Sequence, residues 1–357
     1  MGLIHDNLVR AGHSVDYLCS DALPNRFNGK LARFSFPALV LRHAVNSARQ
    51  GRPYDVVNVH EPIGAAIALW KRAAGCRRVV VTSHGLEQRA WDLLLEEGRL
   101  GRGGPSAQSR FAYPTTVLWQ ARLALLHADH VFCLNMEDRE YLMSRLSVRE
   151  DKITRIYPAA DQLYGETASR RDYSQAKTIV FAGSWIRRKG TDDVVQSFSS
   201  LALRHPQLML VILNGGVPEL AVRSCFPEPL RRRVLCIQAE PEAGTAAALA
   251  AADIYLLPSL FEGTPLTLME AMWSGLPIVT TATCGMADVI NNRSTGLLVP
   301  IRSPEAVVAA AEELLIDSDL RARLGRAAHA QARHSYTWSK VAQPIQELYE
   351  RLCQDQA

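Results

Sequence analysis

The 357-residue sequence has no apolar run that approaches the ~18 residues of a membrane-spanning helix. It also has no apolar segment of signal-peptide type near its N-terminus, no CxxC pair and no cysteine–histidine cluster. The seven cysteines are scattered, which favours free thiols in a reducing compartment over disulfides or a zinc site. The sequence therefore predicts a cytoplasmic protein.

Several ligand-binding patterns are missing as well. The chain contains neither GxGxxG nor GxxxxGK[ST], so a dinucleotide fingerprint or a P-loop is not supported. No cluster of carboxylates has an evident metal-ligand spacing, so we expect no metal cofactor. The formal net charge of +4 is small for this length and indicates no nucleic-acid partner.

Short apolar segments of strand length alternate with spacers of helix length. They lie at 14–19, 55–60, 78–84 and 130–135, and then at 178–183, 208–215, 233–239, 253–259 and 277–283. Continuous apolar strands between helices predict parallel sheets covered on both faces. Because one core rarely serves 357 residues, we expect two domains of this α/β type.

The alternation pauses over residues 151–177, which are polar after Pro158 and predict a linker with the domain boundary near residue 165. The glycine-rich stretch 97–110 predicts a loop. Residues 337–352 predict one helix, or a pair broken near Pro344.

The N-terminus begins with a helical pattern that ends at Gly12, and no strand precedes it. A doubly wound sheet needs its first strand at its centre. We therefore expect Met1 to be an internal methionine, with coding sequence upstream; a divergent but complete domain is the alternative.

Two carboxylates, Glu262 and Glu270, flank an otherwise apolar segment that follows the strand at 254–258. Pro265 suits the first position of a helix, and Gly275 suits the position just past its end. A loop before a helix N-terminus favours phosphate, so the carboxylates can border a ligand site. Solvated surface charges are the alternative.

The segment FEGTPLTLMEAMWSGLPIV, 261–279, resembles the signature of the retaining family 4 glycosyltransferases, whose fold is GT-B. It has the E-x7-E spacing, the Glu-Gly-x-Pro loop and the A-M-x-x-G-x-P run, and similarity continues through 284–315. The resemblance implies that Glu270 holds the ribose of a nucleotide-sugar and that Glu262 contacts the sugar as a catalytic residue. It places the backbone of Gly263, Thr264 and Leu266 near the diphosphate.

The loop in FAGSWIRRKGTDDVV, 181–195, carries cations suited to a diphosphate. It resembles the family's G-R-x-x-x-x-K-G pattern, with Gly183 and Lys189 in register. Ser184 stands where the family has arginine, so Arg187 or Arg188 is expected to compensate. The resemblance makes Lys189 a catalytic residue; a solvated cluster is the alternative.

Further matches are shorter. The Gly215-Gly216 turn resembles the family's donor-side glycines, although such a turn alone is a weak signal. Ser83-His84-Gly85 resembles the loop whose histidine faces the donor sugar, which makes His84 a catalytic candidate. For His60, a structural role is favoured. The family's Asn-Gly is replaced by Ala159-Ala160.

The resemblance implies two Rossmann-like domains facing across a cleft. Residues 1–165 would form the acceptor side without the first strand, 166–336 the donor side, and 337–357 a helix crossing back. The implied reaction is metal-independent, retaining sugar transfer from a nucleoside diphosphate to an acceptor hydroxyl. The implied role is in polysaccharide, glycolipid or other glycoconjugate biosynthesis.

The acceptor would be a glycan or a lipid-linked molecule, so peripheral contact with the inner face of a membrane stays open. A sugar-nucleotide-binding scaffold without activity and a nucleotide-sugar epimerase of the same fold are the alternatives.

Overall fold

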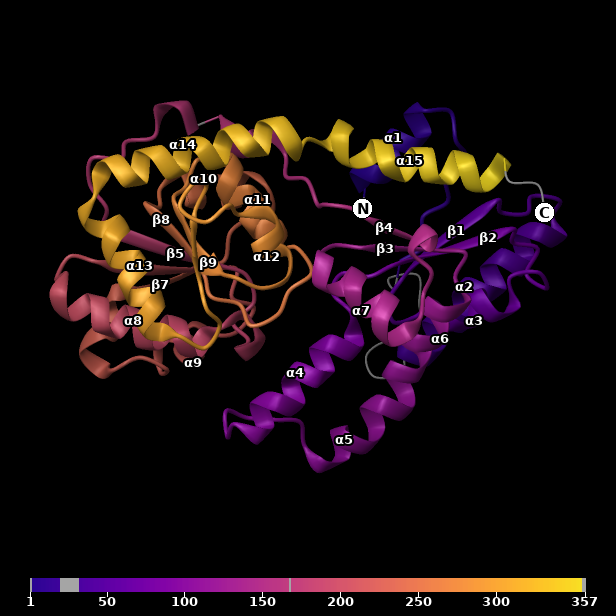
Figure 1. The fold of residues 1–357 in the computed structure, drawn as a ribbon, viewed down its shortest axis with the longest axis horizontal. Coiled ribbons are helices and arrows are strands. Elements are labelled where there is room, and N and C mark those ends of the chain that lie inside the picture. Colours follow the sequence, from indigo (N-terminus) through magenta and orange to yellow (C-terminus); the bar gives the residue numbers. More distant parts are fainter. Residues whose placement is uncertain (1, 20–31, 167, 355–357) are drawn as a thin grey trace. The chain divides into compact units, whose positions relative to one another are not determined.

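The computed structural model describes residues 2–19, 32–166 and 168–354. It divides the chain into two compact units, coloured along the sequence in Figure 1. Unit 1 comprises residues up to Ile156 together with those from Val341 onward, and unit 2 runs from Tyr157 to Lys340. Each unit is built on one parallel sheet.

The sheet of unit 1 has the order β1-β2-β3-β4, and all its pairings are parallel. Its strands are β1 Val56–His60, β2 Arg78–Thr82, β3 His130–Cys133 and β4 Ile153–Arg155. The register places His60 opposite Thr82 and Thr82 opposite Phe132. The carboxyl ends of β1 and β2 therefore lie together, which brings the segments after them to one edge.

The described helices of unit 1 are α1 Gly2–Arg10, α2 Ala32–Arg49, α3 Ala65–Trp70, α4 Glu87–Arg99, α5 Ala107–Tyr113, α6 Trp119–His127, α7 Met136–Leu146 and α15 Trp338–Gln354. Helices α4 and α5 project from the rest of the unit (Figure 1). Val79 and Val81 face a core built with α2, α3, α6 and α7, whereas Val80 faces Ile345 and Leu348 of α15. This alternation along β2 follows from the period of two in a strand.

Two expectations for this half of the chain are wrong. Residues 14–19 form no strand, and none of their side chains is buried; Tyr17 is 59% exposed. Asp16 instead accepts a hydrogen bond from Tyr54 Oη. Conversely, β4 lies inside the stretch expected to be a linker. Pro344 lies within α15 and does not divide it.

The sheet of unit 2 has the order β10-β9-β8-β5-β6-β7, again with every pairing parallel. Its strands are β5 Thr178–Ala182, β6 Met209–Leu213, β7 Val234–Ile237, β8 Ile254–Leu257, β9 Ile278–Thr281 and β10 Leu297–Val299. From central β5 the chain builds outward to β7, then crosses back to β8 and builds toward β10. The strand order thus reverses between β5 and β8, where ligands bind in doubly wound sheets.

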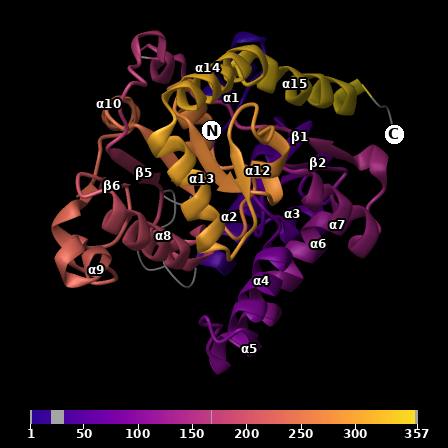
Figure 2. The ribbon, with the colours of Figure 1, turned by 60° about the vertical axis from the view of Figure 1, so that its left-hand side comes forward.

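Helices cover the sheet of unit 2 on both faces (Figure 2). They are α8 Thr191–Arg204, α9 Glu219–Arg223, α10 Ala243–Ala250, α11 Leu266–Trp273, α12 Cys284–Val289, α13 Pro304–Ile316 and α14 Ser318–Ser335. Helix α8 packs against α13, and α11 packs against α14. Among the described helices, none combines the length and the apolar character that crossing a membrane requires.

Candidate active site

The loops that follow β5 and β8 meet at the reversal of strand order in unit 2. The loop after β5 turns through a 3₁₀ segment, Arg187–Lys189, into α8. The loop after β8 leads through Glu262 into α11. Leu260 donates its backbone N–H to the carbonyl of Arg188 at 2.8 Å, which ties the two loops together. Two segments distant in sequence therefore form one surface.

Lys189 and Glu262 form an ion pair across these loops. Lys189 Nζ lies 2.8 Å from Glu262 Oε1, and their side chains are only 12% and 9% exposed. Glu262 Oε1 also accepts a hydrogen bond from Ser259 Oγ at 3.3 Å. An ion pair so shielded from water is costly to break, because a single remaining charge would lack compensation.

Arg188 also lies beside this ion pair. Its Nη1 donates to the carbonyl of Phe261 at 3.0 Å and lies 3.5 Å from Glu262 Oε2. Both carboxylate oxygens of Glu262 thus face a cation. Arg187 and Ser184 lie on the same loop with exposed side chains.

Two glycines make the close packing of these loops possible. A Cβ on Gly183 would lie 3.2 Å from both Cε and Nζ of Lys189, so the lysine lies over this glycine. A Cβ on Gly190 would lie 1.9 Å from the carbonyl oxygen of Pro258, far inside contact distance. Only glycine at position 190 lets the end of the 3₁₀ segment rest on the residue after β8.

Gly190→Ala is expected to destabilise the protein far more than Gly216→Ala. Both glycines have left-handed φ values, 73° and 71°, but a Cβ on Gly216 would meet nothing within 4 Å. The control therefore carries only the backbone cost of about 1–2 kcal/mol, whereas Gly190→Ala adds a clash with backbone. Thermal unfolding measures both. Equal losses would contradict the close contact.

Glu270 lies in the second turn of α11, which ends in a Schellman motif. Leu276 donates to the carbonyl of Ala271 at 3.1 Å, Gly275 donates to that of Met272 at 3.0 Å, and Gly275 has φ 68°. Within the helix Glu270 is buried, 8% exposed, and its Oε1 accepts a hydrogen bond from Tyr164 Oη at 3.1 Å.

Burial raises the pKa of Glu270 to about 6, and the hydrogen bond from Tyr164 opposes this shift. A raised pKa in the folded state means that ionisation costs stability as the pH rises from the usual value of the carboxyl to about 6. Above that pH the group is charged and can accept two hydrogen bonds from a ligand diol. Tyr164 was not expected from the sequence, where it lies in the polar linker.

Tyr164→Phe is expected to raise the pKa of Glu270 above 6, because it removes a donor that stabilises the carboxylate. The affinity for a ligand that donates to this carboxylate should fall as the pH drops through about 6 in the parent protein. In the variant the same fall should occur at higher pH. Calorimetric titration with a nucleoside diphosphate between pH 5 and pH 8 measures this affinity. The same pH dependence in the parent protein and the variant would contradict the effect of Tyr164 on the pKa of Glu270.

The remaining residues named from the sequence lie around these groups. Thr264 is buried, whereas Leu266 at the start of α11 is 48% exposed. The carbonyl of Gly263 accepts the N–H of Gly285 at 2.8 Å, and a Cβ on Gly285 would lie 2.1 Å from Thr264 Oγ1. The carbonyl of Gly215 accepts the N–H of Trp185 at 2.7 Å, so this turn supports the loop after β5.

An open depression of about 530 Å³ adjoins this edge of the sheet, at the carboxyl ends of β9 and β10. Its lining comprises Ala282, Thr283, Asn292, Leu298, Val299, Pro300 and Ile301. Across the described part of the chain, no three His, Cys, Asp or Glu side chains gather in a way that could hold a metal ion.

In unit 1, His84 pairs with His60 at the ends of β2 and β1. His60 Nδ1 and His84 Nε2 are 2.5 Å apart, and the two rings are nearly parallel, with 16° between their planes and their centroids 4.8 Å apart. Burial lowers the pKa of His60 to about 4 and lowers that of His84 as well. Both rings are therefore neutral at pH 7, and one nitrogen must donate while the other accepts.

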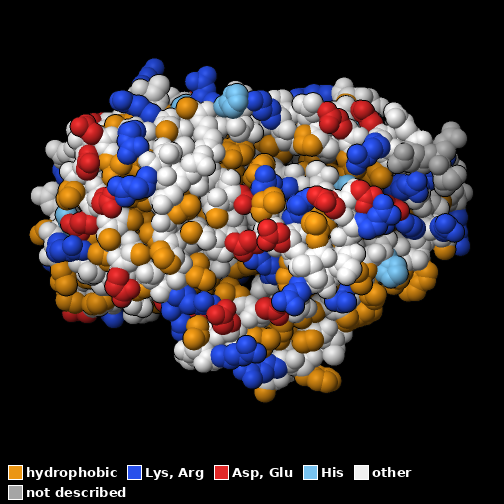
Figure 3. Space-filling model, viewed as in Figure 1, with side chains coloured by type: hydrophobic (Ala, Val, Ile, Leu, Met, Phe, Trp, Pro, Cys, Tyr) orange, Lys and Arg blue, Asp and Glu red, His pale blue; other side chains and the backbone are white. Residues whose placement is uncertain are grey.

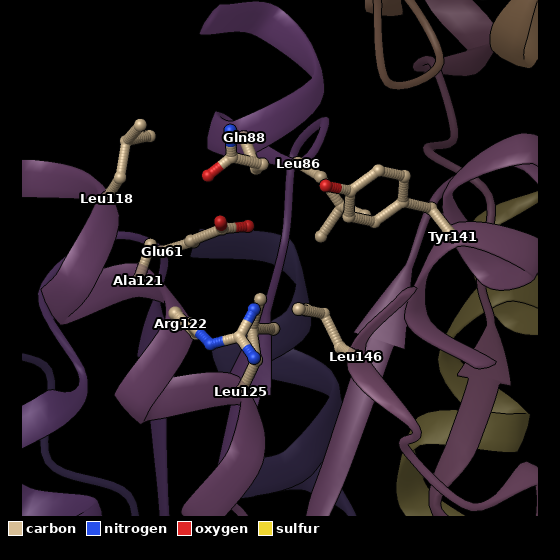
Figure 4. A pocket seen from close by; sticks show the side chains of 9 residues that line it. All are labelled: Glu61, Leu86, Gln88, Leu118, Ala121, Arg122, Leu125, Tyr141 and Leu146. Atoms are coloured by element: carbon tan, nitrogen blue, oxygen red, sulfur yellow. The ribbon is translucent and has the colours of Figure 1, made fainter. Parts of the chain in front are cut away.

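Next to His60, Glu61 points into a small enclosed cavity of about 20 Å³ (Figure 4). Its Oε1 accepts the backbone N–H of Glu87 at 3.1 Å, whereas Oε2 has no hydrogen-bond partner among the described residues. Burial raises the pKa of this carboxyl to about 8. The cavity has room for one water, and the bond from Glu87 ties Glu61 to the start of α4.

The halves of the chain match two family models. A model described as Glycosyltransferase Family 4 matches residues 4–162, and one described as Glycosyl transferases group 1 matches residues 167–331. The chain belongs to glycosyltransferase family 4. The two matches lie on either side of the short segment 163–166, so both sheets of the family 4 chain are covered.

Curated relatives of this family 4 chain act on inositol derivatives, by their names. It is 29% identical over 240 residues to a D-inositol 3-phosphate glycosyltransferase of Corynebacterium glutamicum, covering 62% of this chain and 57% of that protein. It is 27% identical to a phosphatidyl-myo-inositol mannosyltransferase of Mycobacterium leprae, covering 92% of this chain and 82% of that protein. The first match thus spans little more than half of that relative.

Solved structures establish the fold of the family 4 chain as GT-B. A sucrose-phosphate synthase of Thermosynechococcus elongatus superposes with a TM-score of 0.74 at 19% identity, covering 91% of this chain and 81% of that one. The Anabaena protein HepE, in complex with UDP, superposes with a TM-score of 0.66 at 18% identity, covering 89% and 82%. At these identities the likeness concerns the fold alone.

Proposed function

We propose that this chain transfers a sugar from a nucleoside diphosphate sugar to an acceptor hydroxyl, with retention at the anomeric carbon. The convergence of Lys189, Arg188 and Glu262 between β5 and β8 carries this proposal. Cations at this edge suit a diphosphate, and a carboxylate beside them suits sugar hydroxyls. Glu270, in the second turn of α11, accepts the ribose diol.

The chemistry proposed is charge stabilisation of the departing diphosphate. Lys189 and Arg188 neutralise the charge that develops on the leaving phosphate, with the N-terminus of α11 beside them. The departing phosphate oxygen then assists deprotonation of the acceptor hydroxyl on the same face of the sugar, without a metal. In unit 1, the neutral His84 ring can donate or accept one hydrogen bond at a ligand hydroxyl.

The names of the relatives suggest where to look for substrates. UDP is present in the HepE structure, and the two curated relatives are named for inositol acceptors. We infer a polyol or glycan hydroxyl as acceptor, free or lipid-linked, in the biosynthesis of a polysaccharide, glycolipid or other glycoconjugate.

A donor screen tests the proposal. Thermal shift and saturation-transfer measurements across UDP-, GDP- and ADP-sugars should identify one binding donor, and that donor should then be consumed with a polyol or lipid extract. Proton NMR of the product should show retained anomeric configuration. Absence of binding by every donor would contradict the proposal.

A second candidate is a sugar-nucleotide-binding protein without activity. Ser184, where an arginine was expected, favours it, because one cation fewer faces the diphosphate. Donor binding without turnover with any acceptor would support this second function.

A further inference from the structure

Strand β7, Val234–Ile237, is the last strand in the sheet of unit 2, so one of its edges has no neighbouring strand among the described residues. Asn214 donates its N–H to the carbonyl of Ile237 at 2.8 Å, so the backbone of Ile237 is bonded toward β6. Because the backbone groups of successive strand residues point to opposite sides, those of Cys236 point outward. An open edge of this kind is a template for pairing with another chain.

Apolar side chains are exposed along this edge. Leu235 is 38% exposed and Ile237 39%, whereas the residues of the inner strand β8 are all buried. The two residues are separated by one position and therefore share one face of the strand. Edge strands are commonly protected by a charged side chain or a proline, but β7 itself, VLCI, contains neither.

Charges of opposite sign flank β7 at its two ends. Residues 231–233, directly before it, are three arginines, and Glu240 and Glu242 follow it. The first and the third arginine bond to backbone carbonyls of their own unit. Arg232 and Glu240 are exposed and form no ion pair within the described part of the chain. Both lie four residues from Cys236, on opposite sides of it.

A two-fold axis at Cys236 would lay this edge against the same edge of a second copy, with the two strands antiparallel. The two Cys236 residues would then exchange both of their backbone hydrogen bonds, as opposed residues do in an antiparallel ladder. Leu235 of each copy would lie opposite Ile237 of the other, so that their apolar side chains gather on one face. The arginine end of each strand would meet the glutamate end of the other.

The distribution of charge distinguishes between the ways in which this edge can pair. A parallel pairing would bring arginines to arginines and glutamates to glutamates, which opposes association. A linear segment of another protein would satisfy the backbone of the edge, whereas a second copy brings both the matching charges and the matching apolar side chains. The edge is therefore complementary to itself, as an isologous interface requires.

One side chain reaches the start of the edge. Arg223 Nε donates to the carbonyl of Val234 at 3.0 Å, and Arg223 Nη2 is paired with Glu219 at 2.6 Å. A carbonyl oxygen has two lone pairs, so that of Val234 can accept a further bond. The edge therefore stays open to a ladder at this end as well.

We propose that two copies of this chain associate through β7, antiparallel about Cys236, so that two six-stranded sheets continue into each other. Space-filling Figure 3 shows side chains of both signs scattered over the face in view, with hydrophobic ones between them. On that face no large field of one sign keeps two copies apart. The inference stands apart from the proposed transfer reaction, and its test needs no donor.

Sedimentation equilibrium of the full chain tests the association. The chain should show a monomer–dimer equilibrium that shifts toward the dimer as its concentration rises. Ile237→Lys places a charge in the apolar contact twice in each dimer, so it should raise the dissociation constant about a hundredfold. Ile316→Lys is the matched control, because Ile316 is 71% exposed at the end of α13, and it should leave the constant unchanged. A chain that is monomeric at every concentration would overturn the proposal.

Charge reversal tests the antiparallel orientation. Arg232→Glu and Glu240→Arg should each raise the dissociation constant about tenfold, because each creates two pairs of like charges in the dimer. An equimolar mixture of these two variants should dimerise as tightly as the parent chain, since their heterodimer has opposite charges at both ends. Unchanged melting temperatures exclude unfolding.

Two further results would overturn the proposal. A dimer that neither Ile237→Lys nor the charge reversals weaken would place the contact elsewhere. Reversed variants that stay weak when mixed would exclude the antiparallel pairing of β7.

Discussion

Lys189→Ala is expected to lower kcat/KM about 10²–10³-fold, the range for removal of one group that stabilises developing charge in a transition state. Lys189 Nζ is 2.8 Å from Glu262 and its side chain is 12% exposed, so water cannot replace the ammonium efficiently. Arg188, at 3.5 Å, would be left to face both the carboxylate and the diphosphate. Initial rates with the donor identified by the screen measure the effect.

The loss must be separated from damage to the fold, because Lys189→Ala leaves Glu262 shielded with one cation fewer. The double variant Lys189→Met/Glu262→Gln removes both charges and should recover much of the melting temperature without recovering turnover. Lys177→Ala, which removes an exposed lysine just before β5, is the control and should keep full activity. Turnover that returns together with stability in the double variant would make the ion pair purely structural.

Glu270→Ala is expected to weaken donor binding about 10²-fold, since each hydrogen bond to a charged group contributes about 1.5–3 kcal/mol. The free energy of unfolding of the variant should be equal to that of the parent protein or higher. Because burial raises the pKa of Glu270 to about 6, the ionised carboxylate opposes folding at neutral pH, and its removal relieves that cost. Isothermal titration and thermal unfolding at pH 7.5 measure the two quantities.

Two variants complete the Glu270 experiment. Glu270→Gln keeps the shape and loses the charge, so it should lie between the parent and Glu270→Ala in affinity. Glu228→Ala removes an exposed carboxylate of the same unit and should bind donor normally. If Glu270→Ala kept full donor affinity, the proposal that Glu270 binds the ribose would be contradicted.

The strands that could be predicted are those that the core buries. The segments at 55–60, 78–84 and 130–135, and all five in the second half, contain strands of the two sheets. Strands β4 and β10 were not predicted, because each has three residues, which is too few to show a strand pattern of apolar residues. The stretch 14–19 has strand composition, but none of its side chains is buried, so no core stabilises it as a strand.

The individual residues of the candidate site could be predicted from the sequence, but the contacts between them could not. Lys189 and Glu262 were each recognisable from local patterns, but their contact depends on β5 and β8 being neighbours, which the order of the sheet decides. The position of Arg188 beside Glu262 depends on the same pairing of strands. Tyr164 belongs to no periodic pattern, and its bond to Glu270 spans 106 residues.

Helix α15 has a consequence for how the chain is made. Ile345 and Leu348 complete one face of the sheet of unit 1, yet they follow all of unit 2 in the chain. During synthesis from the N-terminus, unit 2 has its full complement of residues before unit 1 does. Unit 1 is therefore the first to be started and the last to be completed. Until α15 is made, the sheet face around Val80 and Phe132 lacks its cover and is a surface to which a chaperone can bind.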